Sequence, residues 1–85
     1  MIPIRKNLES HRGQGVVWSS LGGPVRGWIE DVQVTYRRNG EREVVFIVDT
    51  YKGERRRRMT QHMLYPNMTK WRKHKVELLE FYNSL

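Results

Sequence analysis

A tight-turn signal near the middle of the chain limits the possible folds more than any other feature. Asn39 and Gly40 lie between runs of strand-favouring residues in the segment 25–51. An Asn-Gly pair in this setting predicts a β-hairpin with a two-residue type I′ turn, because both central residues of that turn take positive φ. A two-residue loop also sets the register, so Val34 is expected to face Val45. The signal therefore favours a sheet whose apolar side chains meet on one face.

The two strands of this hairpin differ in their hydrophobic pattern. In residues 25–36, Ile29 falls on the opposite face from the apolar residues that follow it. This change of phase predicts a β-bulge or bend near Glu30 and Asp31, a device that lets one strand wrap across two sheets of a small barrel. Residues 43–51 are apolar on both faces, which is typical of a strand in the middle of a sheet.

Two further strands are expected at residues 13–20 and 54–59. Residues 60–66 predict a single helical turn that leads into a brief last strand, which Pro66 ends. Five short antiparallel strands at this spacing close into a small barrel more readily than they lie open. The expected fold class is therefore mainly β: a small five-stranded antiparallel barrel over residues 12–66, followed by a C-terminal α-helix.

The remaining segments complete a single domain, since 85 residues leave no room for a second core. Residues 1–11 are expected to form an N-terminal arm or a short helix. Residues 67–85 predict the α-helix, with Asn67 or Thr69 as its N-cap. Its apolar stripe, which includes Trp71, is expected to pack on the barrel and cover an open end. Surplus apolar residues leave a homodimer through this helix as one option.

The charge balance indicates the kind of partner. The chain has 16 Lys and Arg residues against 9 Asp and Glu, a net charge of +7. This excess favours polyanions, with nucleic acid first and an acidic protein surface second, unless it only maintains solubility. The absence of cysteine excludes disulfides and thiolate metal sites. No apolar run is long enough for a membrane span or a secretory signal, so we expect a cytoplasmic protein that does not bind membranes.

The basic residues gather at the hairpin tip, in the next turn and strand, and at the start of the last helix. The candidate nucleic-acid-binding residues are Arg37, Arg38, Arg42, Tyr51, Lys52, Arg55, Arg56, Arg57, Arg58, Lys70, Arg72 and Lys73. The four consecutive arginines at 55–58 alternate between the two faces of a strand. Burying either pair inside a closed barrel would cost much free energy, because the charges would be unpaired. This strand is therefore expected to be an edge, a splayed rim or a surface covered by something anionic.

Two interpretations of these side chains stay open. Guanidinium groups suit phosphate because they donate two parallel hydrogen bonds, and nearby aromatic rings could stack on bases. The aromatic residues concerned are Trp28, Tyr36, Tyr51 and Tyr65. Alternatively, the aromatic side chains belong to the core, and the arginines pair on the surface with Glu41, Glu43 and Glu54.

Three segments carry a resemblance to a known class of barrel: residues 13–18 as an opening strand, residues 27–32 as a second strand that starts with glycine, and residues 59–66 as the closing strand. Their layout resembles the small five-stranded barrels of the KOW and Tudor kind, within the wider Src-homology-type class. In that class the closing strand often follows one tight turn and ends in a Leu-x-Pro-like segment, matched here by residues 64–66. The resemblance implies a barrel over residues 12–66.

The sequence departs from this class in two ways. The Asn-Gly hairpin is longer than such barrels usually carry. Trp18, Trp28 and Tyr51 are candidates for the aromatic cage of Tudor domains, but its acidic partner is not placed. An Sm-like barrel is the nearest alternative: the residues ahead of Gly13 fit its leading helix, while its second sequence motif is missing from residues 55–66.

Support for an enzyme is weak. His11, His62 and His74 are scattered over three elements with no metal-ligand spacing. Three carboxylates near the bulge and the following strand could approach one another and bind a cation or act as an acid/base pair. The alternatives are that they pair with arginines such as Arg26 or that the predicted bulge separates them. These carboxylates are Glu30, Asp31 and Asp49. We therefore expect no enzyme, no cofactor and no metal.

The function favoured by the sequence is that of a basic, non-catalytic nucleic-acid-binding module that holds RNA or DNA mainly through phosphate contacts. The alternative is an adaptor or inhibitor that docks on an acidic surface of a partner protein, such as a small viral protein acting on a host component. The charge and its clustering support both, because each needs an exposed cationic surface.

Overall fold

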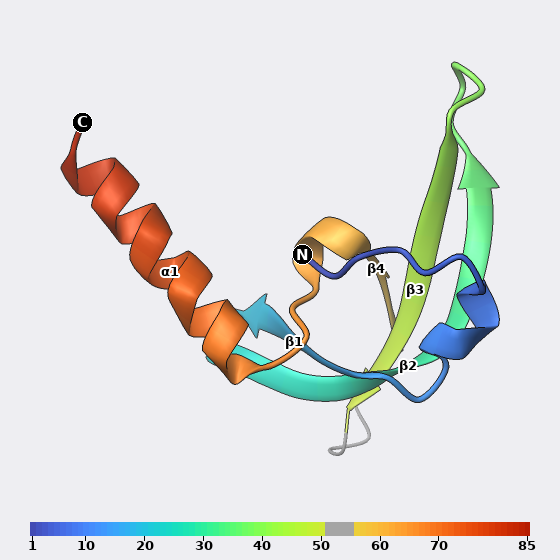
Figure 1. Cartoon of the computed structure of the whole chain (residues 1–85), viewed down its shortest axis with the longest axis horizontal. Helices are drawn as coiled ribbons and strands as arrows, with labels where there is room; N and C mark the ends of the chain where they lie inside the picture. The colour runs from blue at the N-terminus through green and yellow to red at the C-terminus, as the bar shows by residue number, and fades with distance from the viewer. Residues whose placement is uncertain (51–55) are drawn as a thin grey trace.

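The structure of the chain is a computed structural model that describes residues 1–50 and 56–85. In chain order the elements are the 3₁₀-helix η1 (Leu8–His11), strands β1 (Gly15–Ser20), β2 (Gly23–Tyr36), β3 (Arg42–Thr50) and β4 (Arg57–Thr60), the 3₁₀-helix η2 (Gln61–Met63) and the α-helix α1 (Met68–Asn83). Within these residues the four strands form one antiparallel sheet in the order β1-β2-β3-β4 (Figure 1). The mainly β class and the C-terminal helix are confirmed.

The predicted five-stranded closed barrel is wrong: the described strands number four, and their sheet is open. The expected fifth strand is reduced to one bridge, in which Val17 and Tyr65 each donate a backbone N–H to the other's carbonyl, both at 2.8 Å. Because hydrogen-bonded and non-hydrogen-bonded pairs alternate in an antiparallel ladder, the next residues that could bond to β1 are Met63 and Asn67. Met63 belongs to η2, and Asn67 is the N-cap of α1. Only one residue is therefore left to pair with β1.

The hairpin between β2 and β3 exists, but its predicted turn type is wrong. The Arg37 N–H donates to the Glu41 carbonyl at 2.8 Å and the Gly40 N–H to the Arg37 carbonyl at 2.9 Å, which leaves three residues in the loop. Of the three loop residues, Gly40 is the one with positive φ, at 84°. Asn39 does not adopt the positive φ that a type I′ turn requires, and its side-chain oxygen accepts from the Glu41 N–H at 3.0 Å. Such a loop is the next most common hairpin connection.

The longer loop shifts the register by one residue. Val34 faces Val44 and not Val45, and Val32 faces Phe46. Apolar side chains still oppose one another because neighbouring positions in β3 are also apolar. The predicted bulge is confirmed, since the register of β2 on β3 changes at Glu30.

Replacing Gly40 by alanine is expected to lower the free energy of unfolding by about 1 kcal/mol, because an L side chain resists positive φ. Urea denaturation followed by tryptophan fluorescence measures this. Gly22→Ala is the control, since Gly22 has an ordinary φ and open space around it. Equal stability of the two variants would contradict the positive φ of Gly40.

The strand order confirms two further predictions. β3 lies inside the sheet, in line with apolar residues on both of its faces, and β4 lies at an edge, in line with its arginines. The core contains Ile2, Val16, Trp18, Ile29, Phe46, Val48, Met59 and Leu64. Ile2 belongs to the N-terminal arm, so the arm is part of the packed structure.

The helix α1 contacts the sheet only near its start. Asn67 caps it, as predicted, by accepting from the Lys70 N–H at 2.9 Å. The Trp71 indole N–H donates to the Ser19 hydroxyl of β1 at 2.9 Å. The rest of the helix extends away from the strands (Figure 1). Its exposed apolar residues are Val76, Leu79, Phe81 and Tyr82. The expectation that the helix covers an open end is therefore wrong for its second half, and the homodimer stays a prediction.

Candidate anion-binding groove

The structure does not bring the predicted basic residues together on one surface. The hairpin arginines lie at one end of β3, whereas Arg58 of β4 faces Ile47. Five residues separate Arg42 from Ile47, a distance of about 17 Å along an extended strand. Tyr51, Lys52 and Arg55, which the sequence also marked as candidates, lie outside the described residues.

Arg37 is paired within the protein. Its Nε lies 3.1 Å from a carboxylate oxygen of Glu43, and its Nη1 lies 3.9 Å from Glu41. The hydrogen bond to Glu43, followed by the charge of that carboxylate, raises the pKa of Arg37 above its ordinary value. The surface pairing that the sequence left open as an alternative is therefore correct for this arginine.

The carboxylates near the bulge are also paired with arginines. Arg56 lies 3.7 Å from Glu30 and 3.8 Å from Asp49, so these two carboxylates approach one another around one guanidinium, as expected. Arg12 contacts the third, Asp31, at 2.7 Å. The partners are thus Arg12 and Arg56, and not Arg26 as the sequence suggested.

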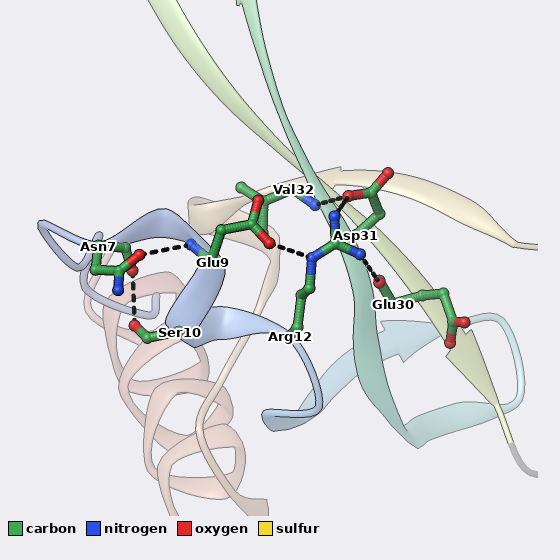
Figure 2. Close-up of polar contacts among 7 residues, drawn as sticks. All are labelled: Asn7, Glu9, Ser10, Arg12, Glu30, Asp31 and Val32. Atoms are coloured by element: carbon green, nitrogen blue, oxygen red, sulfur yellow. Dashed lines mark hydrogen bonds and ion pairs between the residues drawn. The ribbon is translucent and has the colours of Figure 1, made fainter.

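Arg12, which the sequence analysis did not single out, ties η1 to the bulge of β2. Figure 2 shows its guanidinium between the Glu9 carboxylate, the Asp31 carboxylate and the backbone carbonyl of Glu30. The hydrogen bond to Glu9 and the charge of Asp31 raise the pKa of Arg12. Asp31 in turn accepts from the Val32 N–H at 2.8 Å. The cluster is a structural brace, because one guanidinium holds a carboxylate of η1 and both a carboxylate and a backbone carbonyl of β2.

The other described arginines of the candidate set remain available. Arg38, Arg42, Arg57, Arg58 and Arg72 are exposed, and within residues 1–50 and 56–85 no carboxylate forms an ion pair with them. Successive residues of a strand point to opposite faces, so Arg57 and Arg58 do not share a surface. The question is therefore which available cations converge on one place.

Among these arginines, Arg42 lies with other cations in a groove of about 470 Å³ between the N-terminal arm, the loop end of the β2–β3 hairpin and the junction of β4 with η2. We call it the basic groove. Its charged lining residues in the described part of the chain are Arg5, Lys6, Arg37, Arg42 and Glu43, and His62 also lines it. Four cations thus face one carboxylate, which is itself bound to Arg37.

The arm that carries Arg5 and Lys6 is held in place by His11. The backbone N–H of Arg5 donates to His11 Nε2 at 3.0 Å, and its guanidinium donates to the Ser10 carbonyl at 2.7 Å. His11 Nδ1 is 2.7 Å from the side-chain oxygen of Gln14. The groove is therefore formed in advance, which lowers the ordering cost of binding.

Sequence reasoning missed Arg5, Lys6 and His62 as site residues. Two adjacent cations in the arm were a signal, but no local pattern indicates that the arm returns beside the hairpin. That placement depends on burial of Ile2, whose N–H donates to the Gln61 carbonyl at 3.2 Å.

Two of the three helix candidates line a second concavity. Lys70 and Lys73 of α1 lie in a hollow of about 380 Å³, together with Tyr65 and His74, whose rings are 5.5 Å apart. We call it the helix hollow. Burial raises the pKa of the Tyr65 phenol above its ordinary value. Arg72 lies outside both concavities.

The aromatic candidates divide between surface and core. Tyr36 is 71% exposed and faces Arg42 across the hairpin. Trp28 is half-buried and donates its indole N–H to Glu30 at 2.8 Å. Trp18 is buried in the core, so it does not offer a cage surface to a ligand. Tyr36 is thus the most accessible ring near the basic groove.

The described residues contain no cluster of His, Asp and Glu that could hold a metal ion, and none of their helices is long and apolar enough to cross a bilayer. Comparisons with protein-family models, curated proteins and solved structures gave no match. The resemblance to KOW and Tudor barrels therefore stays a prediction.

Proposed function

We propose that this protein is a non-catalytic nucleic-acid-binding module that holds backbone phosphates in the basic groove. The observation that carries the proposal is the convergence of Arg5 and Lys6 from the arm with Arg37 and Arg42 from the hairpin. Segments far apart in sequence place their cations around one concavity, and no opposing carboxylate pairs with Lys6 or Arg42 in the described chain. Such an arrangement leaves positive charge for an external anion.

Each cation has a distinct part in this proposal. Arg42 is free to donate two parallel hydrogen bonds to a phosphate, and Lys6 supplies a mobile point charge. Arg37 is oriented by Glu43 and adds to the field of the groove. The exposed ring of Tyr36 offers a surface on which a base can stack.

Replacing both Lys6 and Arg42 by alanine is expected to weaken binding of a labelled oligonucleotide by about tenfold or more at low salt. The slope of log affinity against log salt is expected to fall by about 1.5, because two phosphate contacts are lost. Fluorescence anisotropy at several salt concentrations measures both quantities.

The control is Arg26→Ala with Arg58→Ala, which removes the same charge from exposed positions outside the groove. Its affinity should stay closer to that of the unmodified protein. Equal losses in the two double variants would show that net charge alone drives binding and would contradict a site in the groove.

Docking on an acidic protein surface is the second candidate function. The second half of α1 exposes Leu79, Phe81 and Tyr82, which nucleic-acid binding does not require. A stoichiometric protein complex recovered after nuclease treatment, and lost when Leu79 and Phe81 are replaced by serine, would support this function over the first. Recovery that depends on intact nucleic acid would support the groove.

A further inference from the structure

The basic groove and the helix hollow share the N-terminal arm. Met1 and Pro3 line the hollow, whereas Arg5 and Lys6 line the groove. The Cα atoms of residues two positions apart lie at most about 7 Å from one another in any chain conformation, so this limit holds for Pro3 and Arg5. The two concavities therefore meet at the arm, which crosses in front of the strands toward the hairpin side (Figure 1).

The arm is a fixed ridge between them. Ile2 is fully buried, its carbonyl accepts from the Gln61 side chain at 3.1 Å, and its N–H donates to the Gln61 backbone. Three residues later, the Arg5 N–H is held by His11. A ligand that reaches from one concavity to the other must cross this ridge without displacing it.

Charge and aromatic surface continue across the ridge. The hollow presents Lys70 and Lys73 against one described lining carboxylate, Glu77. It also presents Tyr65, a half-buried ring beside His74. Proteins that bind single strands combine cationic grooves with aromatic rings in this way, because phosphates and base faces are then accessible together.

We propose that groove, arm and hollow form one track for single-stranded nucleic acid, an inference that rests on the proposed function. A flexible strand can bend over the ridge and place phosphates on both sides of it, whereas the two backbones of a stiff duplex cannot follow it. Met1 to Lys6 spans at most about 18 Å, which corresponds to about five nucleotides at the 3.4 Å rise of a stacked strand. A trinucleotide is therefore expected to fill one concavity, and a decanucleotide is expected to reach both.

The test measures affinity for a trinucleotide and a decanucleotide, each as deoxyribose and ribose forms, and for a decamer duplex. The decanucleotide is expected to bind the unmodified protein about a hundredfold more tightly than the trinucleotide, because the second contact is intramolecular. Lys73→Glu is expected to remove most of this advantage. Arg72→Glu, the same charge change on the neighbouring residue outside both concavities, is expected to retain it. A difference between the two sugar forms would identify which one the track prefers.

Three outcomes would overturn the track. One is a duplex affinity equal to that of the single strand, and another is an equal loss of the length advantage in Lys73→Glu and Arg72→Glu. The third is equal affinity of the unmodified protein for the trinucleotide and the decanucleotide. In that case, weaker oligonucleotide binding by the Lys6→Ala and Arg42→Ala double variant would still support the groove. An unmodified protein that binds no oligonucleotide of any length would overturn the proposed function itself, and the track with it.

Discussion

Replacing Gly27 by alanine is expected to destabilise the fold by about 3 kcal/mol or more, which for a domain this small approaches loss of the native state. A Cβ at this position would lie 2.5 Å from Cη2 of Trp18 and closer still to the backbone carbonyl oxygen of Asp49. Trp18 is only 2% exposed, and Asp49 belongs to the internal strand β3, so neither neighbour can move away easily. Urea denaturation followed by tryptophan fluorescence measures the loss.

Gly15→Ala is the matched control, because Gly15 also lies in a strand but has open space where its Cβ would stand. Its free energy of unfolding should change by no more than about 0.5 kcal/mol. If Gly27→Ala were as stable as Gly15→Ala, the close approach of the Trp18 ring to β2 would be incorrect.

Local patterns predicted the elements of this fold because each depends on neighbours in sequence. The phase change around Ile29 predicted the bulge, and the Asn67 signal predicted the start of α1; the structure confirms both. The prediction of a closed barrel was wrong at one place, the expected fifth strand, for a reason that neighbours in sequence do not reveal. Whether the segment around Tyr65 pairs with β1 over one residue or several depends on where η2 ends and α1 begins, and no periodicity reports that.

The hairpin register shows a different limit. An Asn-Gly pair suits both a two-residue and a three-residue loop, since Gly40 can take positive φ in either. Hydrophobic matching could not decide between them, because Val44 and Val45 are identical partners for Val34. In the observed loop the Asn39 side chain accepts from the Glu41 N–H, an interaction that the strand pattern does not predict.

The candidate site was predicted in part. Composition indicated a polyanionic ligand, and the hairpin arginines indicated part of the groove. Charge counting could not separate Arg37, which is bound to Glu43, from Arg42, which is not. It also could not place Lys6 and Arg42 around one groove, because that arrangement requires the arm to dock on the sheet. Binding itself stays a prediction until oligonucleotides are titrated.

The docking of the arm makes His11 the second position with a large expected effect. His11→Ala should lower the free energy of unfolding by about 3 kcal/mol, since it removes a fully buried ring that packs edge-on against Phe46 at 4.9 Å. It also leaves the Arg5 N–H without its acceptor. Chemical denaturation measures the effect, with the exposed His62→Ala as the control, for which a change within about 0.5 kcal/mol is expected.

A His11→Phe variant separates packing from hydrogen bonding. Phenylalanine retains a ring in the core but cannot accept from Arg5 or donate to Gln14, so a loss of about 1–3 kcal/mol should remain. Amide hydrogen exchange should accelerate at Arg5 more than in the strands, because release of the arm is a local opening. Unchanged exchange at Arg5 would mean that burial of Ile2 alone holds the arm, and that the basic groove does not depend on His11.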